Sequence, residues 1–277
     1  MLKYLCLSLA IVLNLQAEPV KVTAITYNIR NDNKNDKGVR NWDDRKSKVT
    51  DYLLKRNASI IGMQEVFLNQ LQDVDKALPD HSHIGVGRDD GKTRGEYSPI
   101  FYNSKIWKPD PAEQGTFWLS DTPEKIGSRT WGNYHNRICT WARLTHIQKG
   151  HSIYVYNTHW DHKSQNAREK SAELILKKIR NRSQKNEPVL LMGDFNATTE
   201  NKAIKTLLTS GIVTDPGKKQ FSTGSKWQAP LRPGLRIDHI FVSKEWKNAT
   251  VTVESNGDPE GNAASDHHPV VLVAELP

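Results

Sequence analysis

Residues able to bind a metal ion recur in this sequence where predicted strands end. The stretch LLMGDFN (190–196) is an apolar run that stops at a glycine and then presents Asp194 and Asn196. Side chains two residues apart point to the same side of a strand, so these two oxygen donors leave the strand end together. The spacing indicates a site at that end of the strand.

Five further segments place polar residues in or just after an apolar strand. They are 24–29 with Asn28, 60–66 with Glu65, 154–160 with Asn157 and His159, 237–240 with Asp238, and 265–267 with Asp266 and His267. A single buried Asn or His is more often a hydrogen-bonded core residue than a ligand. The inference therefore depends on the repetition of the pattern.

Four of these residues are carboxylates, and they would repel one another beside apolar strands unless they shared a cation or imidazoles: Glu65, Asp194, Asp238 and Asp266. Oxygen donors without cysteine favour Mg²⁺, Mn²⁺ or Ca²⁺ over zinc. His159 and His267 are then candidates for clamping a phosphate and activating water.

The overall charge is compatible with an anionic partner. The 277 residues include 39 Lys and Arg against 31 Asp and Glu, a formal net charge of +8. Such a charge suits a phosphoester, a nucleic acid or a membrane surface, and it equally suits simple solubility. The basic residues are spread over several segments rather than gathered in one.

The first 17 residues, MLKYLCLSLAIVLNLQA, have the composition of a secretory signal peptide and are too short for a stable membrane anchor. We therefore expect a secreted or periplasmic bacterial protein, with residues 18–277 as one domain and a monomer as the working unit. Removal of the peptide leaves Cys139 as the only cysteine, which excludes an intramolecular disulfide. Cys139 reads as a small buried hydrophobe.

Strand and helix patterns alternate along the chain. Strand-like runs lie at 20–29, 59–66, 99–103, 116–119, 139–146, 152–160, 189–195, 237–243, 250–254 and 268–275, and helical periodicity fits 43–56, 69–78, 164–182 and 201–208. Helices between strands, together with hairpin-like strands, predict two packed mixed β-sheets covered outside by helices. The glycine-rich segment 85–97 reads as a surface loop.

Six strings, in order and with the expected spacing, resemble the endonuclease/exonuclease/phosphatase superfamily, which includes pancreatic-type (DNase I-like) deoxyribonucleases. The strings are TYNIR (26–30), QEV (64–66), NTHWDH (157–162), GDFN (193–196), RIDHIFVS (236–243) and SDHHPV (265–270). The loop GRDDGKTRGEYSPIFYN and the stretch RICTWARL further resemble secreted bacterial members. The resemblance covers nearly all of the chain after the signal peptide.

The resemblance implies a four-layered α/β/β/α sandwich with the active site at one end. It also implies roles by matched position: Glu65 as the main metal ligand, helped by Asn28 and Asp266; Asp194 and Asn196 positioning water and phosphate; His267 as general base, oriented by Asp238; and His159 bonded to a phosphate oxygen. Asp194 is the alternative base. Four residues, Arg88, Glu96, Arg137 and Asn157, are predicted to contact the substrate.

Three functions fit these features. The first is a secreted metal-dependent phosphodiesterase or phosphomonoesterase acting on a small or lipid-linked phosphoester. The second is a secreted nuclease, favoured by the positive charge but lacking a long basic arm or an arginine-rich helix. The third is a binding protein that kept the fold without catalysis. Residues 116–119, with Phe117 and Trp118, are the one candidate for an aromatic membrane contact.

Overall fold

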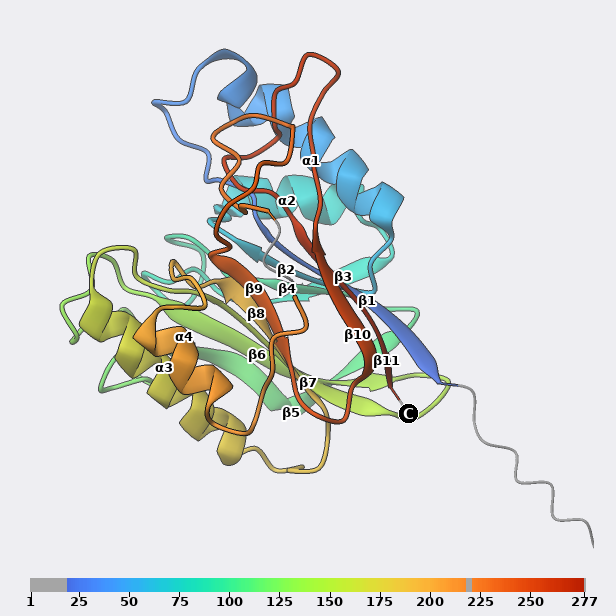
Figure 1. Cartoon of the computed structure of the whole chain (residues 1–277), viewed down its shortest axis with the longest axis vertical. Coiled ribbons are helices and arrows are strands. Elements are labelled where there is room, and N and C mark those ends of the chain that lie inside the picture. The colour runs from blue at the N-terminus through green and yellow to red at the C-terminus, as the bar shows by residue number, and fades with distance from the viewer. Residues whose placement is uncertain (1–18, 218–220, 277) are drawn as a thin grey trace, which may run out of the picture.

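Two mixed β-sheets pack face to face, and two helices cover the outer side of each sheet (Figure 1). The structure is a computed structural model that describes residues 19–217 and 221–276. The α/β/β/α sandwich predicted from the sequence is confirmed. The proposed signal peptide, residues 1–17, lies outside the described residues.

The first sheet has six strands: β1 (Val20–Asn28), β2 (Ile60–Gln64), β3 (His81–Ile84), β4 (Ile100–Asn103), β10 (Lys247–Val253) and β11 (Val270–Leu276). Their spatial order is β10-β11-β1-β2-β4-β3. β1 and β2 are parallel, and every other neighbouring pair is antiparallel. The parallel pair therefore brings the carboxyl ends of β1 and β2 to one edge.

The second sheet has five strands: β5 (Trp107–Trp118), β6 (Ile138–His146), β7 (Ser152–His159), β8 (Val189–Asp194) and β9 (Asp238–Val242). They follow one another in the order β5-β6-β7-β8-β9. β7 and β8 are parallel, so their carboxyl ends also meet at one edge. β9 runs antiparallel to β8 and contributes its first residue there.

The helices are α1 (Trp42–Arg56), α2 (Leu68–Ala77), α3 (Gln165–Arg180) and α4 (Lys202–Leu208), with a short 3-10 turn η1 at Gly38–Arg40. Side-chain caps fix where three of them begin. Asn41, Ser164 and Asn201 each accept a hydrogen bond from a backbone N–H of the following turn. Among the described residues, no helix is long and apolar enough to cross a membrane.

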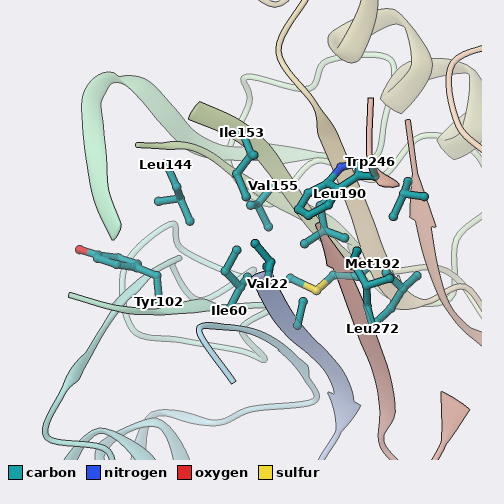
Figure 2. Close-up of a cluster of buried hydrophobic side chains, with 14 of the residues drawn as sticks. Val22, Ile60, Tyr102, Leu144, Ile153, Val155, Leu190, Met192, Trp246 and Leu272 are labelled. Atoms are coloured by element: carbon teal, nitrogen blue, oxygen red, sulfur yellow. The ribbon is translucent and has the colours of Figure 1, made fainter. Parts of the chain in front are cut away.

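Aliphatic side chains from both sheets fill the space between them. Val22 and Ile60 of the first sheet meet Val155, Leu190 and Met192 of the second (Figure 2). Two further apolar layers lie outside, one under α1 and α2 and one under α3 and α4. The shared middle layer fixes the two sheets against each other and so fixes the strand ends that carry the polar residues.

Two strands differ from the sequence prediction. The sequence does not predict β3, because HSHI is too polar to resemble a buried strand. The four residues are half-buried in the structure, as suits an edge strand. β5 begins at Trp107, whereas the sequence predicts a strand only from residue 116. The first half of β5 contains two prolines and an irregular register, which hide the strand pattern but which an edge strand tolerates. Phe117 and Trp118 are buried, at 3% and 4% exposure, so residues 116–119 are not an exposed aromatic contact for a membrane.

Candidate active site

Three polar residues of the second sheet lie in register on neighbouring strands. His159 of β7 is paired with Asp194 of β8, and Asp194 is paired with Asp238 of β9. Residues paired in this way project from the same face of a sheet. His159 Nε2 lies 3.5 Å from Asp194 Oδ2, and both carboxylates are buried.

His267 joins this row from the loop that precedes β11. Its Nδ1 lies 2.8 Å from Asp238 Oδ2, and its Nε2 lies 3.8 Å from Asp194 Oδ2. The carboxylate can only accept, so Nδ1 carries the hydrogen and Nε2 is free to take a proton. Ser265 holds the loop against the first sheet, because its hydroxyl donates to the Asn28 carbonyl at 2.7 Å.

The first sheet contributes Asn28 and Glu65. Asn28 Nδ2 donates to Glu65 Oε1 at 3.1 Å and to Asp194 Oδ2 at 3.0 Å, so this amide connects the two sheets at the site. Glu65 follows the end of β2 with φ of 59°, and Asn196 follows β8 with φ of 48°. Residues other than glycine rarely adopt this left-handed backbone conformation, and such backbone strain is concentrated at functional positions.

Asn196 supports Asp194 directly. Its backbone N–H donates to Asp194 Oδ1 at 2.9 Å, and its side-chain amide donates to the Trp160 carbonyl at 3.1 Å. Asn196 is half-buried, so its side chain is fixed at the edge of the site rather than within the core. Asp194 and Asn196 are thus in contact through the backbone N–H of Asn196, which lies beyond the end of β8, while the Asn196 side chain is bonded to Trp160.

Arg30 also reaches the site, and the sequence analysis assigned it no role. Its Nη1 lies 4.0 Å from Glu65 Oε2 and 3.8 Å from Asp266 Oδ2. Asp266 is thus separated from Glu65 by a guanidinium. The signal available in the sequence was its place two residues after Asn28 within TYNIR. In the structure its backbone has φ of 57° just past the strand end.

The electrostatics indicate excess negative charge in a buried place. Burial, and then the neighbouring Asp238, raise the pKa of Asp194 well above its usual range. Burial and Glu65 likewise raise the pKa of Asp266. Burial alone would lower the pKa of His267, but the carboxylates of Asp238 and Asp194 outweigh it and raise that pKa well above the usual value.

These residues fit a divalent cation. Asp194, Asp238 and His267 each place a ligand atom within 4.8 Å of the others, and Asp238 Oδ1 is buried without a hydrogen-bond partner among the described residues. A cation would satisfy that oxygen and offset the repulsion between the carboxylates. The ligand set of this group differs from the predicted one, which consisted of Asn28, Glu65 and Asp266.

Arg88, Glu96 and Arg137 lie beside His159. Arg88 Nη1 donates to Glu96 Oε2 at 2.6 Å, and Arg137 Nη1 lies 4.0 Å from the same oxygen. Glu96 Oε2 is 3.9 Å from His159 Nδ1. Burial, followed by the positive charges of Arg137 and Arg88, lowers the pKa of His159 well below its usual value, so this imidazole is neutral.

Asn157 does not belong to this group, which corrects the prediction that it contacts the substrate. It is fully buried between the sheets, where its Nδ2 donates to the Met63 and Pro99 carbonyls at 2.8 Å each. Its Oδ1 accepts from Gln64 Nε2 at 2.7 Å. Every polar atom of its amide is therefore used inside the protein, and its role is to join the sheets.

Three histidines beside the motifs occupy different settings. His239 is buried beneath the segment that joins β8 to α4. Its Nε2 lies 2.9 Å from the Ala197 carbonyl of that segment, and its ring stacks on Phe241. His268 is buried, and its backbone N–H donates to the Thr223 carbonyl. His162 is exposed, with its Nδ1 3.3 Å from Arg137 Nη2. Of the three, only His162 can line the site.

The family model for the endonuclease/exonuclease/phosphatase family matches residues 25–267. The chain belongs to this family. Members of the family hydrolyse phosphoester bonds, and the match runs from the middle of β1 to His267, so it includes every strand end described above. No curated protein matches the sequence significantly.

Three solved structures of this family are similar over nearly their whole length. A family protein from Bacteroides vulgatus is 35% identical with a TM-score of 0.85, and the match covers 93% of this chain and 100% of that one. A family protein from Bacteroides thetaiotaomicron is 31% identical with a TM-score of 0.86, over 94% and 100%. A mannosyl-6-phosphatase from Bacteroides thetaiotaomicron is 32% identical with a TM-score of 0.84, over 91% and 99%.

Proposed function

We propose that this protein is an exported, divalent-metal-dependent hydrolase of phosphoester bonds. The observation that carries the proposal is the convergence of Asp194, Asp238 and His267, whose ligand atoms lie within 4.8 Å of one another. Asn28 extends the cluster to Glu65 of the opposite sheet. Such a cluster combines acceptors for a cation with a base, which are the two requirements for bringing water to an anionic phosphorus.

The metal ion would be held by Asp194, Asp238 and Glu65, which the Asn28 amide links to Asp194, while Asp266 lies on the other side of the Arg30 guanidinium from Glu65. Mg²⁺ suits these oxygen donors, and Mn²⁺ and Ca²⁺ are the alternatives. When bound, the ion supplies positive charge that neutralises the phosphate and the charge that develops on its oxygens. Burial, and after it the neighbouring carboxylates Asp238 and Glu65, raise the pKa values of Asp194 and Asp266, and such an ion would relieve that repulsion.

His267 would act as the general base. Asp238 holds Nδ1–H at 2.8 Å, and this leaves Nε2 free to accept a proton from water as the new P–O bond forms and the bond to the leaving oxygen breaks. Asp194, held by the Asn196 N–H, would orient that water. A neutral His159 can donate its ring N–H to a phosphate oxygen. The pH dependence of an Asp238 variant separates His267 from Asp194 as the base.

A small phosphomonoester is the substrate class that we propose first. Its support is the mannosyl-6-phosphatase that is 32% identical over 91% of this chain. A nuclease remains the second candidate because of the net charge of +8. We further propose that the mature chain begins near residue 18 outside the cytoplasm and acts as a monomer, which N-terminal sequencing of exported protein and size-exclusion chromatography would test.

Hydrolysis of four probes with and without metal tests the proposal. Purified residues 18–277 are incubated with p-nitrophenyl phosphate, mannose 6-phosphate, bis-p-nitrophenyl phosphate or plasmid DNA, each with Mg²⁺, Mn²⁺ or Ca²⁺ and with EDTA. We expect at least one phosphoester to be hydrolysed with metal and none with EDTA. Turnover that persists undiminished after exhaustive chelation would overturn the metal requirement.

Metal binding has a second readout that does not need turnover. A ligand that binds only the folded state raises the free energy of unfolding by about 2.7 kcal/mol at a hundredfold excess over its Kd. We expect Mg²⁺ or Mn²⁺ to raise the thermal midpoint of the wild type, and Glu65→Gln to reduce that rise. Metal and phosphate binding without hydrolysis of any probe would favour the non-catalytic binding protein instead.

A further inference from the structure

Two buried arginines beside the site keep hydrogen-bond donors that the described residues do not use. Arg88, Glu96 and Arg137, called here the arginine corner, come from the loop at 85–97 and from the residue before β6. The side chains of Arg88 and Arg137 are 9% and 4% exposed. Glu96 is the one carboxylate close to both guanidiniums, since its Oε2 lies 2.6 Å from Arg88 Nη1 and 4.0 Å from Arg137 Nη1.

The guanidiniums also keep unused donors. Arg88 Nε, Arg137 Nε and Arg137 Nη1 are buried without a hydrogen-bond partner among the described residues. Asp161 offsets part of the charge of Arg137 from 4.0 Å, the same distance as Glu96, but no hydrogen bond joins it to the guanidinium, and its carboxylate accepts N–H bonds from residues 134, 163 and 164. Buried donors without partners are costly, so this arrangement points to a group that comes from outside.

The corner is one side chain away from the catalytic carboxylate. His159 lies between them, with its Nδ1 3.9 Å from Glu96 Oε2 and its Nε2 3.5 Å from Asp194 Oδ2. Asn31 makes a second link, since its side chain donates to Glu96 Oε1 at 3.1 Å and its backbone N–H to Glu65 Oε2 at 3.2 Å. A phosphorus within reach of Asp194 and His267 would therefore have its outer oxygens near the two arginines.

Three histidines around the corner respond to the same positive charge. Burial, then Arg88 and Arg137, lower the pKa of His135 to about 4. Burial and Arg137 lower the pKa of His162, and His159 is lowered by burial, Arg137 and Arg88. His159 and His162 stand three residues apart at the end of β7, and His135 lies in the loop before β6. Burial is the largest cause of each shift and the arginines are the next, so the corner disfavours a further cation and favours an anion.

We propose, on the basis of the phosphoesterase function above, that Arg88 and Arg137 bind the outer oxygens of a terminal phosphate and thereby select phosphomonoesters over phosphodiesters. A monoester is close to doubly charged above pH 7, because its second pKa is about 6. A diester carries one charge and a second organic group where the guanidiniums lie. Arginine forks match phosphate oxygens with two parallel hydrogen bonds.

The test compares two esters of the same leaving group at pH 8. For the wild type, Arg88→Met, Arg137→Met, Glu96→Gln and Arg143→Met, kcat/KM is measured for p-nitrophenyl phosphate and bis-p-nitrophenyl phosphate, together with Ki for inorganic phosphate. Arg143 is the matched control, because it lies further along β6 and pairs with Glu187 at 2.7 Å and Asp110 at 3.2 Å. Thermal midpoints show which variants are folded.

We expect each arginine variant to lower the monoester-to-diester ratio of kcat/KM by at least tenfold and to raise Ki for phosphate by a similar factor, since a charge-assisted hydrogen bond contributes roughly 1.5–3 kcal/mol. Glu96→Gln removes the neutralising carboxylate and should lower Ki. Arg143→Met should change neither quantity. Arg→Lys variants, which keep the charge, replace any methionine variant that does not fold.

The two proposals fail in different ways. If the arginine variants hydrolyse both esters with an unchanged ratio and an unchanged Ki, the selection of monoesters is wrong while the phosphoesterase stands. If the wild type hydrolyses neither of these esters, nor mannose 6-phosphate or plasmid DNA, with any metal, the phosphoesterase is wrong. The corner is then judged by calorimetric binding of inorganic phosphate, which the arginine variants should weaken, and equal binding by all variants would overturn it.

Discussion

Asn157 and Asp194 belong to two buried polar clusters that lie one step apart on the same pair of strands. Asn157 of β7 is paired with Met192 of β8, and two residues further along, His159 is paired with Asp194. Both clusters face the opposite sheet: Asn157 accepts from Gln64 there, and Asp194 accepts from Asn28. Their positions are therefore nearly equivalent, and their chemistry is not.

The Asn157 cluster is neutral and closed. The Asn157 amide donates both of its N–H hydrogens to backbone carbonyls. Gln64 Oε1, which is buried without a hydrogen-bond partner among the described residues, is an uncharged oxygen. The Asp194 cluster holds two carboxylates and a histidine, and its charges shift the pKa values of Asp194 and His267 upwards. Burial of polar groups alone therefore indicates structure, whereas uncompensated buried charge indicates a site for a ligand.

Removing His267 should have the largest effect on catalysis. His267→Ala deletes the base, so we expect a loss of roughly 10²–10⁴ in the kcat of the folded protein. The thermal midpoint should fall as well, because the buried Asp238 loses its imidazole partner. Steady-state hydrolysis of p-nitrophenyl phosphate with saturating metal measures the loss of kcat. His83→Ala is the matched control, because His83 is half-buried on the edge strand β3 beside Asp75. Wild-type turnover by His267→Ala would remove the imidazole from the mechanism.

Removing Asn157 should lower the stability of the fold while leaving the kcat of the folded protein almost unchanged. Asn157→Ala leaves the Met63 and Pro99 carbonyls without their donor, and each buried unpaired group costs about 1–3 kcal/mol. We expect a fall of roughly 2–5 kcal/mol in the free energy of unfolding by urea, since the cavity adds to that cost. The folded fraction should keep kcat within a few-fold of the wild type. A large loss of kcat without destabilisation would restore Asn157 to the substrate site.

The fold and much of the site could be predicted because they follow from local rules. Apolar runs such as 60–64 and 189–194 predicted the inner strands, and the polar residues that end those runs predicted where the site lies. Parallel pairing then explains why Asn28 and Glu65 meet at one edge, and β7 and β8 at another. The apolar runs and their polar ends can be read from the sequence, whereas the direction in which neighbouring strands run is seen in the structure.

The errors arose where the deciding partner is distant in the sequence. Asn157 and His159 stand in the same NTH string, and only the position of Gln64, 93 residues away, shows that Asn157 is closed. Arg30 reads as an ordinary surface cation until Glu65 and Asp266 are placed on either side of it. Residue type shows which groups can be charged, but the balance of charge in a cluster depends on the tertiary structure.

The smallest expected effect is a shift in the pH dependence of kcat/KM when a charge of the Asp194 cluster is removed. A base must be neutral to accept a proton, and Asp238 and Asp194 raise the pKa of His267, so kcat/KM of the wild type should keep rising as the pH increases above 6.5. Asp238→Asn removes the largest attraction that raises this pKa while keeping a group beside Nδ1. The rising limb should therefore move to lower pH, and the maximum should fall less than in His267→Ala because the imidazole is still present. Profiles of kcat/KM from pH 5 to 10 with p-nitrophenyl phosphate measure both changes. A limb that stays in place in Asp238→Asn but moves in Asn28→Ala, which removes a hydrogen bond from Asp194, would assign the base to Asp194 instead.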